Sequence, residues 1–175
     1  MLPSGTRVHP LATYADERGA FTELFREEWE TGVSPVQWNA VASAAGVMRG
    51  VHVHVRHGDY LTVVSGRAHV GLRDLREGSP TAGLATLIEL RADAMAAIVI
   101  PPGVAHGFLF AEPSLHVYAV THYWDHDDEL GCHWADPELE IAWPQVPALL
   151  SDRDAAAGSL ASLQERLAPH QLALA

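Results

Sequence analysis

The stretch that decides the fold is RGVHVHVRHGDYLTVVSG, residues 49–66. Its first half alternates valine with His52 and His54, and its second half is a β-prone run that ends at Gly66. Side chains of a strand alternate between two faces, so we expect both histidines on the same face. The stretch predicts two strands, and its histidines with Asp59 allow three interpretations: a metal site, an acid/base site, or polar residues on a sheet surface.

The same strand signal recurs on both sides of this stretch. Four further β-prone runs are RAHVGLRDL (67–75), ATLIEL (85–90), AAIVIPPG (96–103) and HVYAVTHYW (116–124). Short runs punctuated by Gly and Pro favour a sandwich or barrel over βαβ units. Helical signals are limited to REEWETG (26–32), which predicts a short helix, and SDRDAAAGSLASLQERLA (151–168), which predicts a helix after a Ser or Asp cap.

Composition restricts the classes of function. The chain has 175 residues and a formal charge of -11, which argues against binding to nucleic acid or to a membrane surface. Lysine is absent, so Schiff-base catalysis is excluded and any phosphate must be bound by Arg. The single cysteine, Cys132, indicates a reducing compartment, and we expect a cytoplasmic protein of one domain.

Seven blocks, in this order, resemble the dTDP-4-dehydrorhamnose 3,5-epimerase family: DERGAFTELF, QWNAVASAAGVMRGVH, VGLRDLREGSPTAG, VIPPGVAHGF, VYAVTHYW, LGCHWADPELEIAWP and LLSDRD. The resemblance implies an all-β cupin jelly roll (double-stranded β-helix) with short flanking helices. It implies one domain over 1–175, with an N-terminal arm (1–35), a core (about 36–145) and a C-terminal helical segment (146–175). It also implies a homodimer that epimerises a dTDP-linked or similar nucleotide-linked 4-keto-6-deoxy sugar without a cofactor.

The resemblance also implies roles for individual residues. His52 falls on the family's base, Asp154 rather than Asp152 on the aspartate that orients it, and Tyr118 on the general acid. Such a set suits proton removal and return beside a ketone. The substrate-binding positions implied by the resemblance are Arg18, Glu23, Gln37, Asn39, Arg49, His106, Tyr123 and Trp124.

Two positions depart from the family pattern. The family usually has Gln at the position of His54 and a Lys, which helps to stabilise the enolate, at the position of Asp59. With His52 and His106, these residues resemble the metal motif of metal-binding cupins, and the set suits Zn, Fe, Mn, Ni or Co. A divalent ion could replace the Lys as a Lewis acid. The alternatives are a metal-dependent isomerase, lyase or oxygenase, or a binding homologue without activity. His52 could be a base or a ligand, and His57 is expected in an exposed turn.

Overall fold

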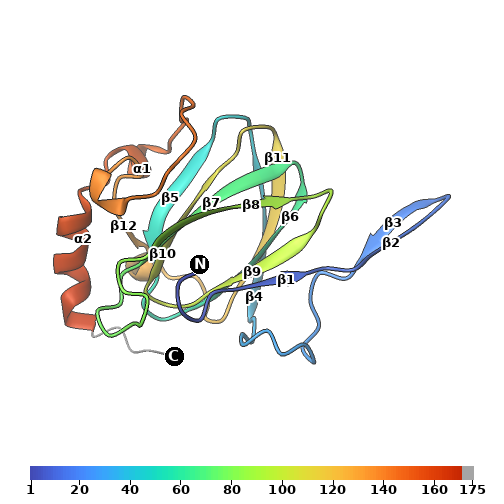
Figure 1. The fold of residues 1–175 in the computed structure, drawn as a ribbon, viewed down its shortest axis with the longest axis horizontal. Coiled ribbons are helices and arrows are strands. Elements are labelled where there is room, and N and C mark those ends of the chain that lie inside the picture. The colour runs from blue at the N-terminus through green and yellow to red at the C-terminus, as the bar shows by residue number, and fades with distance from the viewer. Residues whose placement is uncertain (171–175) are drawn as a thin grey trace.

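The computed structural model in Figure 1 describes residues 1–170, without the side chain of residue 127, so residues 171–175 of the predicted C-terminal segment lie outside the described residues. Strands form two five-stranded antiparallel sheets. The first sheet has the order β1 (Arg7–Pro10), β9 (Ala96–Ile100), β6 (Asp59–Ser65), β11 (Ser114–Val120), β4 (Gln37–Ser43). The second has the order β12 (Leu130–Gly131), β5 (Met48–Val53), β10 (Val104–Leu109), β7 (Arg67–Asp74), β8 (Ala85–Arg91).

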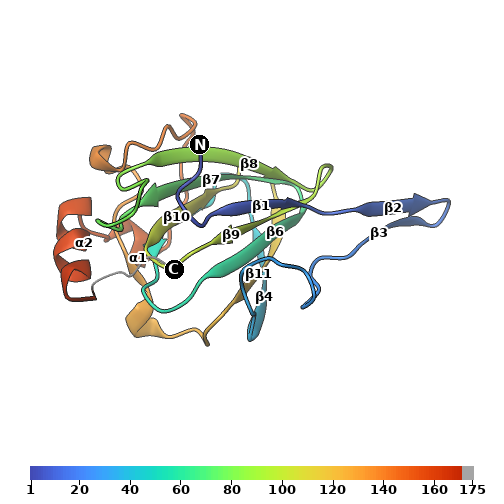
Figure 2. The same ribbon diagram turned by 60° about the horizontal axis from the view of Figure 1, so that its bottom comes forward.

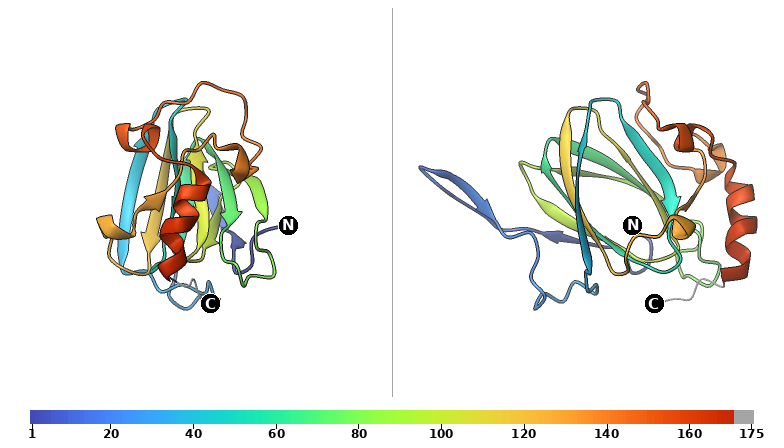
Figure 3. Two further views of the ribbon diagram at one scale, coloured as in Figure 1. Left: turned by 90° about the vertical axis from the view of Figure 1, so that its left-hand side faces the viewer. Right: turned by 180° about the vertical axis from the view of Figure 1, so that it is seen from behind.

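The two sheets face each other and enclose an apolar core (Figure 3). Leu61 and Ile98 come from the first sheet, and Val70 and Leu72 from the second. All four side chains are at most 2% exposed, as expected where two inner faces interdigitate. The predicted jelly roll is therefore confirmed, and strands cover most of each β-prone run read from the sequence.

The predicted helix over 26–32 is wrong. This segment forms turns, in which the Trp29 amide donates to the Arg26 carbonyl and the Thr31 amide to the Trp29 carbonyl. Trp29 packs with Phe25 on the outer face of the first sheet. An isolated helix of two turns costs more to nucleate than it gains, so the packing of the two aromatic side chains decides the conformation.

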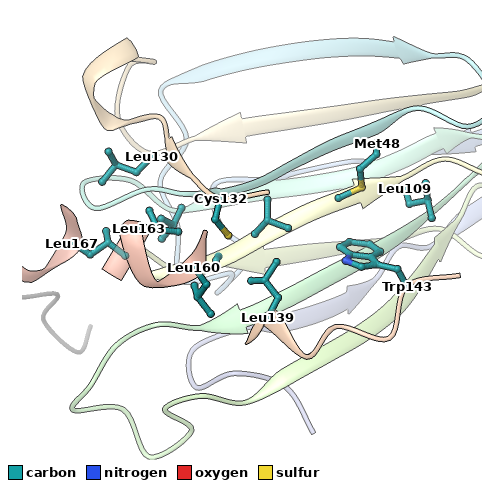
Figure 4. Close-up of a cluster of buried hydrophobic side chains, with 12 residues drawn as sticks. Met48, Leu109, Leu130, Cys132, Leu139, Trp143, Leu160, Leu163 and Leu167 are labelled. Carbon is teal, nitrogen blue, oxygen red and sulfur yellow. The ribbon is translucent and has the colours of Figure 1, made fainter. Parts of the chain in front are cut away.

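The C-terminal segment covers the outer face of the second sheet. Figure 4 shows Leu160, Leu163 and Leu167 directed at a buried cluster that also contains Cys132 and Trp143. These leucines lie on one face of α2 (Leu160–Leu167), the spacing of an amphipathic helix. Burial of this face fixes α2 against β5 and β12.

The helical signal over 151–168 resolves into two helices. α1 (Asp152–Ala155) begins after Ser151, whose side chain accepts from the Asp154 amide, and α2 begins after Ser159 in the same manner. Each serine therefore serves as an N-cap; Ser151 is the cap that the sequence suggested, and Ser159 is a second one. Three one-turn 3-10 helices complete the described elements: η1 (His126–Asp128), η2 (Pro137–Leu139) and η3 (Ala168–His170).

Part of the predicted N-terminal arm projects from the molecule as a separate hairpin, whereas β1 of the same arm belongs to the first sheet. β2 (Thr13–Asp16) pairs with β3 (Gly19–Thr22) and with no other described strand. Figures 1 and 2 show this hairpin projecting from the barrel, at the end opposite α2. A two-stranded ribbon exposed on both sides is marginally stable alone, so it needs a surface to pack against. No helix of the described residues is long and apolar enough to cross a membrane.

Candidate active site

Strand pairing brings polar side chains together on the inner face of the first sheet. In β6 and β11, Asp59 is opposite Val120, and Leu61 is opposite Tyr118. Tyr118 is also opposite Asn39 of β4. Directly opposed residues share a face, and Leu61 belongs to the core between the sheets. Asp59, Tyr118 and Asn39 therefore face the interior of the jelly roll.

The second sheet supplies the histidines from the opposite side. His52 of β5 is opposite His106 of β10, and the ring of His54 lies 5.2 Å from that of His106. Oδ2 of Asp59 lies 3.9 Å from Nε2 of His54 and 3.8 Å from Nε2 of His106. Side chains of both sheets therefore meet at one point inside the barrel.

His52 is held by the C-terminal segment. Its Nε2 lies 2.8 Å from Oδ1 of Asp154 and 2.7 Å from Nη2 of Arg153. One nitrogen cannot donate to the first and accept from the second. Asp154 is 7% exposed and also accepts from the Gly50 amide, whereas Arg153 is 49% exposed and has Glu129 as another partner. We assign the Nε2 proton to the bond with Asp154, which leaves the Nδ1 lone pair as the basic site.

The ionisation of Asp154 supports this assignment. Burial alone would raise its pKa, but the hydrogen bond and charge of His52, with donors from Gly50 and Ser151, lower the pKa to about 2. The carboxylate therefore stays ionised at neutral pH. A buried carboxylate fixes the imidazole and stabilises its protonated form, which is what a proton-abstracting histidine requires.

The His52–Asp154 pair opens on a cavity of about 530 Å³, a volume in the range of small-molecule sites. Arg49 lines the cavity, and its Nε donates to the hydroxyl of Ser43 at 3.0 Å. The residues that line the cavity are Val47, Met48, Arg49, His52, Leu149, Leu150, Ser151, Arg153 and Asp154.

The buried imidazoles His54 and His106 are neutral at physiological pH. Burial, with the charge of His57, lowers the pKa of His54 to about 3. Burial, with the charge of His54, lowers the pKa of His106 also to about 3. Each ring therefore keeps one nitrogen lone pair available, as a hydrogen-bond acceptor or a ligand.

The acidic groups of the interior shift in the opposite direction. Burial, together with the negative charges of Glu129 and Asp128, raises the pKa of Asp59 well above its ordinary value. Burial and the charge of Asp59 raise the pKa of Tyr118. Tyr118 therefore remains a phenol at neutral pH and is in the correct state to donate a proton.

Glu129 lies between the rim residue Trp124 and the two histidines His52 and His54, although no motif in the sequence singled it out. Its carboxylate accepts from Nε1 of Trp124 at 3.0 Å and from Nη1 of Arg153 at 3.3 Å. It also lies 3.8 Å from Nδ1 of both His52 and His54. The acidic run DHDDE, residues 125–129, was the available signal, but an acidic run is more often a solvated surface.

His57 is not in an exposed turn, so that expectation is wrong. It is 2% exposed, and its ring stacks on His54 at 4.0 Å between centroids. Its Nδ1 lies 3.2 Å from Oδ2 of Asp128 without forming a hydrogen bond, and the Asp128 carboxylate accepts from the Val55 amide through Oδ1 and from the Arg56 amide through Oδ2. The turn carries His57 inward because Asp128 holds both the turn backbone and the ring.

Of the eight predicted substrate-binding residues, Arg49 lines the cavity and His106 lies beside Asp59. The other six divide into two groups, and the first lies at the rim of the barrel. The amide nitrogen of Gln37 donates to Oδ1 of Asn39 at 3.0 Å, and its oxygen accepts from the Trp124 backbone at 3.0 Å. Trp124 is 50% exposed and Tyr123 69% exposed. Exposed aromatic faces beside fixed amides form a surface on which a flat base can stack.

The second group, Arg18 and Glu23, lies away from the space between the two sheets of the same chain. Arg18 is in the turn of the projecting β2–β3 hairpin, is 84% exposed, and pairs with Asp16. Glu23 follows β3 and forms an ion pair with Arg26. Neither side chain contacts the His52–Asp154 pair within one chain.

The pair of His52 and Asp154 makes stability dependent on pH. The pKa of Asp154 is lower in the folded chain than its ordinary value of 3.8, so its contribution is complete above that value and is lost as pH falls toward 2. We expect Asp154→Asn to cost about 2 kcal/mol of unfolding free energy at pH 7, and about half as much at pH 3. Urea denaturation at both pH values, with Asp152→Asn as the control, measures the difference. Equal losses at the two pH values would contradict the linkage.

Two facing antiparallel sheets with polar side chains between them define a cupin jelly roll. A model of the family described as dTDP-4-dehydrorhamnose 3,5-epimerase matches residues 4–162. The chain therefore belongs to the dTDP-4-dehydrorhamnose 3,5-epimerase family, which confirms the resemblance found in the sequence.

Individual relatives agree with this assignment. The chain is 38% identical over 150 residues to the dTDP-4-dehydrorhamnose 3,5-epimerase of Pseudomonas aeruginosa, covering 81% of this chain and 83% of the relative. It resembles the crystal structure of the Legionella pneumophila 3,5-epimerase in complex with dTDP-4-keto-L-rhamnose, with a TM-score of 0.83, 33% identity, and coverage of 91% and 92%. It also resembles a 3'-monoepimerase from Streptomyces bikiniensis in complex with dTDP-quinovose, with a TM-score of 0.87, 29% identity, and coverage of 98% and 90%.

Proposed function

We propose that this protein epimerises a dTDP-linked 4-keto-6-deoxy sugar by removing and returning a proton at a carbon beside the ketone. The observation that carries the proposal is the His52–Asp154 pair at 2.8 Å, which opens on a cavity beside Arg49. Membership of the family supports the reaction type, and the relatives described above are 3,5-epimerases or a monoepimerase of dTDP-sugars.

The two proton-transfer roles fall on opposite sheets. His52 on β5 removes the proton, and Asp154 stabilises the imidazolium that results. Tyr118 on β11 returns a proton to the carbon from the other side of the sugar ring. Inversion requires donation on the face opposite to removal, so a base and an acid on two facing sheets suit the reaction.

The nucleotide would bind at the rim and through a second copy of the chain. Gln37, Asn39, Tyr123 and Trp124 supply amides and aromatic faces for the base. We propose a homodimer in which the projecting hairpin brings Arg18 to the diphosphate in the partner's site. The planar guanidinium of Arg binds phosphate oxygens in pairs, and the position of Arg18 outside its own site supports such an exchange.

Hydrogen exchange with solvent tests the proposal. In D₂O, a dTDP-linked 4-keto-6-deoxy sugar should take up deuterium at C3, C5 or both, as measured by NMR of the recovered nucleotide sugar. Absence of exchange across a panel of such sugars would refute the epimerase function. Tight binding of a dTDP-sugar without exchange would identify a binding homologue without catalytic activity.

A further inference from the structure

Three buried side chains beside the His52–Asp154 pair have no role in proton removal or return. Oδ2 of Asp59 faces Nε2 of His54 at 3.9 Å and Nε2 of His106 at 3.8 Å. All three residues are at most 6% exposed. Within the described part of the chain, no hydrogen bond satisfies the Asp59 carboxyl, and the distances to the two rings are too long for one. The three side chains therefore face one another without a hydrogen bond between them, and a ligand shared by all three would be stabilising.

The partners of the other ring nitrogens establish which atoms face inward. Nδ1 of His54 lies 3.2 Å from the Asp128 carbonyl, and Nδ1 of His106 lies 3.0 Å from the Val104 carbonyl. A carbonyl only accepts, so each Nδ1 carries the proton and each Nε2 presents a lone pair. Imidazoles that bind metals have this pattern, in which the far nitrogen donates to a backbone carbonyl and fixes the ring.

The charged side chains around Oδ2 of Asp59 and the Nε2 atoms of His54 and His106 favour the binding of a cation. Glu129 and Asp128 place two further carboxylates near Asp59, and both are largely buried. Arg153 pairs with Glu129 but is half exposed at the rim. The inner end of the site therefore has more negative than positive charge, and the described residues place no guanidinium within ion-pair distance of Asp59.

We propose that His54, Asp59 and His106 bind one divalent transition metal ion, and that this ion stabilises the enolate oxygen of the substrate. Ligand atoms on one Zn²⁺ lie roughly 3.0–3.6 Å apart, given bonds of roughly 2.0–2.2 Å, so the two rings must move toward Asp59 and toward each other when the ion binds. Two imidazoles and one carboxylate leave coordination positions open for a substrate oxygen. His57, stacked on His54, is within reach as a fourth ligand, since ligand atoms of His54, His57 and Asp59 lie within 4.8 Å of one another.

The role of the ion in catalysis depends on the proposed epimerase function. When His52 takes the proton, the electron pair of the broken C–H bond forms a C=C bond to the carbonyl carbon, and the π pair of the ketone moves onto its oxygen, which gives an enolate. A Lewis acid at that oxygen lowers the barrier without any change of oxidation state. His52 is not a ligand in this arrangement, because Asp154 holds its Nε2. The four-residue set predicted from sequence therefore becomes three ligands and a separate base.

Metal binding is tested first without any assay of activity. After treatment with EDTA, the protein should take up about one Zn²⁺ per chain in isothermal titration calorimetry, and Co²⁺ should give a visible absorption band. His54→Gln and Asp59→Asn should each weaken Zn²⁺ binding by at least about 100-fold, whereas His69→Gln on β7 should not. Failure to bind Zn²⁺ or Co²⁺, or equal binding by all variants, would overturn the site.

Catalysis is tested next. EDTA should suppress deuterium exchange in the wild type and Zn²⁺ should restore it. The double variant His54→Gln with Asp59→Lys, which puts an ammonium group in place of the ion, should exchange equally with and without EDTA. Zn²⁺ binding with exchange that is unaffected by EDTA would overturn the Lewis-acid role. Zn²⁺ binding with no exchange in any form would refute the epimerase function and leave the metal site intact.

Discussion

His52→Gln is expected to lower the rate of deuterium exchange into the sugar by about 10²–10⁴-fold, the usual contribution of a general base. Glutamine fills a similar volume and can still donate to Asp154, but its amide has no basic nitrogen. The cavity and the rim should therefore keep their shape, and affinity for dTDP should change little. Exchange followed by NMR at saturating substrate, together with calorimetric titration of dTDP, separates the two effects.

A matched control removes a histidine that lies away from the cavity. His69 is on β7, opposite Leu109 of β10, and touches none of the residues assigned to proton transfer. His69→Gln should leave exchange unchanged. If His52→Gln retained more than a tenth of the wild-type rate, the base would have to be another group, and Asp154 would have only a structural role.

The sequence predicted the strands well because their signal is local. A run such as ATLIEL carries its own β propensity and ends at turn residues, so it remains a strand in almost any all-β context. REEWETG also carried a local signal, for a helix, but Trp29 gains more by packing on the first sheet than the segment gains as a helix. Local patterns fail where a single long-range contact outweighs them.

The site was less accessible to sequence reasoning because its contacts are distant in the chain. His52 and Asp154 are separated by 102 residues, and only the family resemblance joined them. Glu129 and Asp128 carry no motif, yet they contact or surround three of the histidines. The sequence left His52 as either a base or a ligand. We propose different residues for the two roles, because Asp154 holds His52 while His54 and His106 face Asp59.

Tyr118→Phe is expected to separate proton exchange from inversion. The phenol is the proposed donor on the far face, and burial keeps it protonated at neutral pH by raising its pKa. Phenylalanine keeps the ring but cannot return a proton. His52, 20% exposed, can still remove the proton, exchange it with solvent and return it to the same face. Epimer formation should fall by at least about 100-fold, while deuterium uptake persists.

Tyr60→Phe supplies the control for this variant. Tyr60 is the neighbour of Leu61 on β6 but points to the outer face of the sheet, where its hydroxyl donates to the Leu24 carbonyl at 2.5 Å. Its loss should cost about 1 kcal/mol of stability and leave inversion unchanged. NMR of the product distinguishes deuterated substrate from deuterated epimer. If Tyr118→Phe lost exchange and inversion to the same extent, the tyrosine would be acting in proton removal, and the assignment of base and acid to opposite sheets would be wrong.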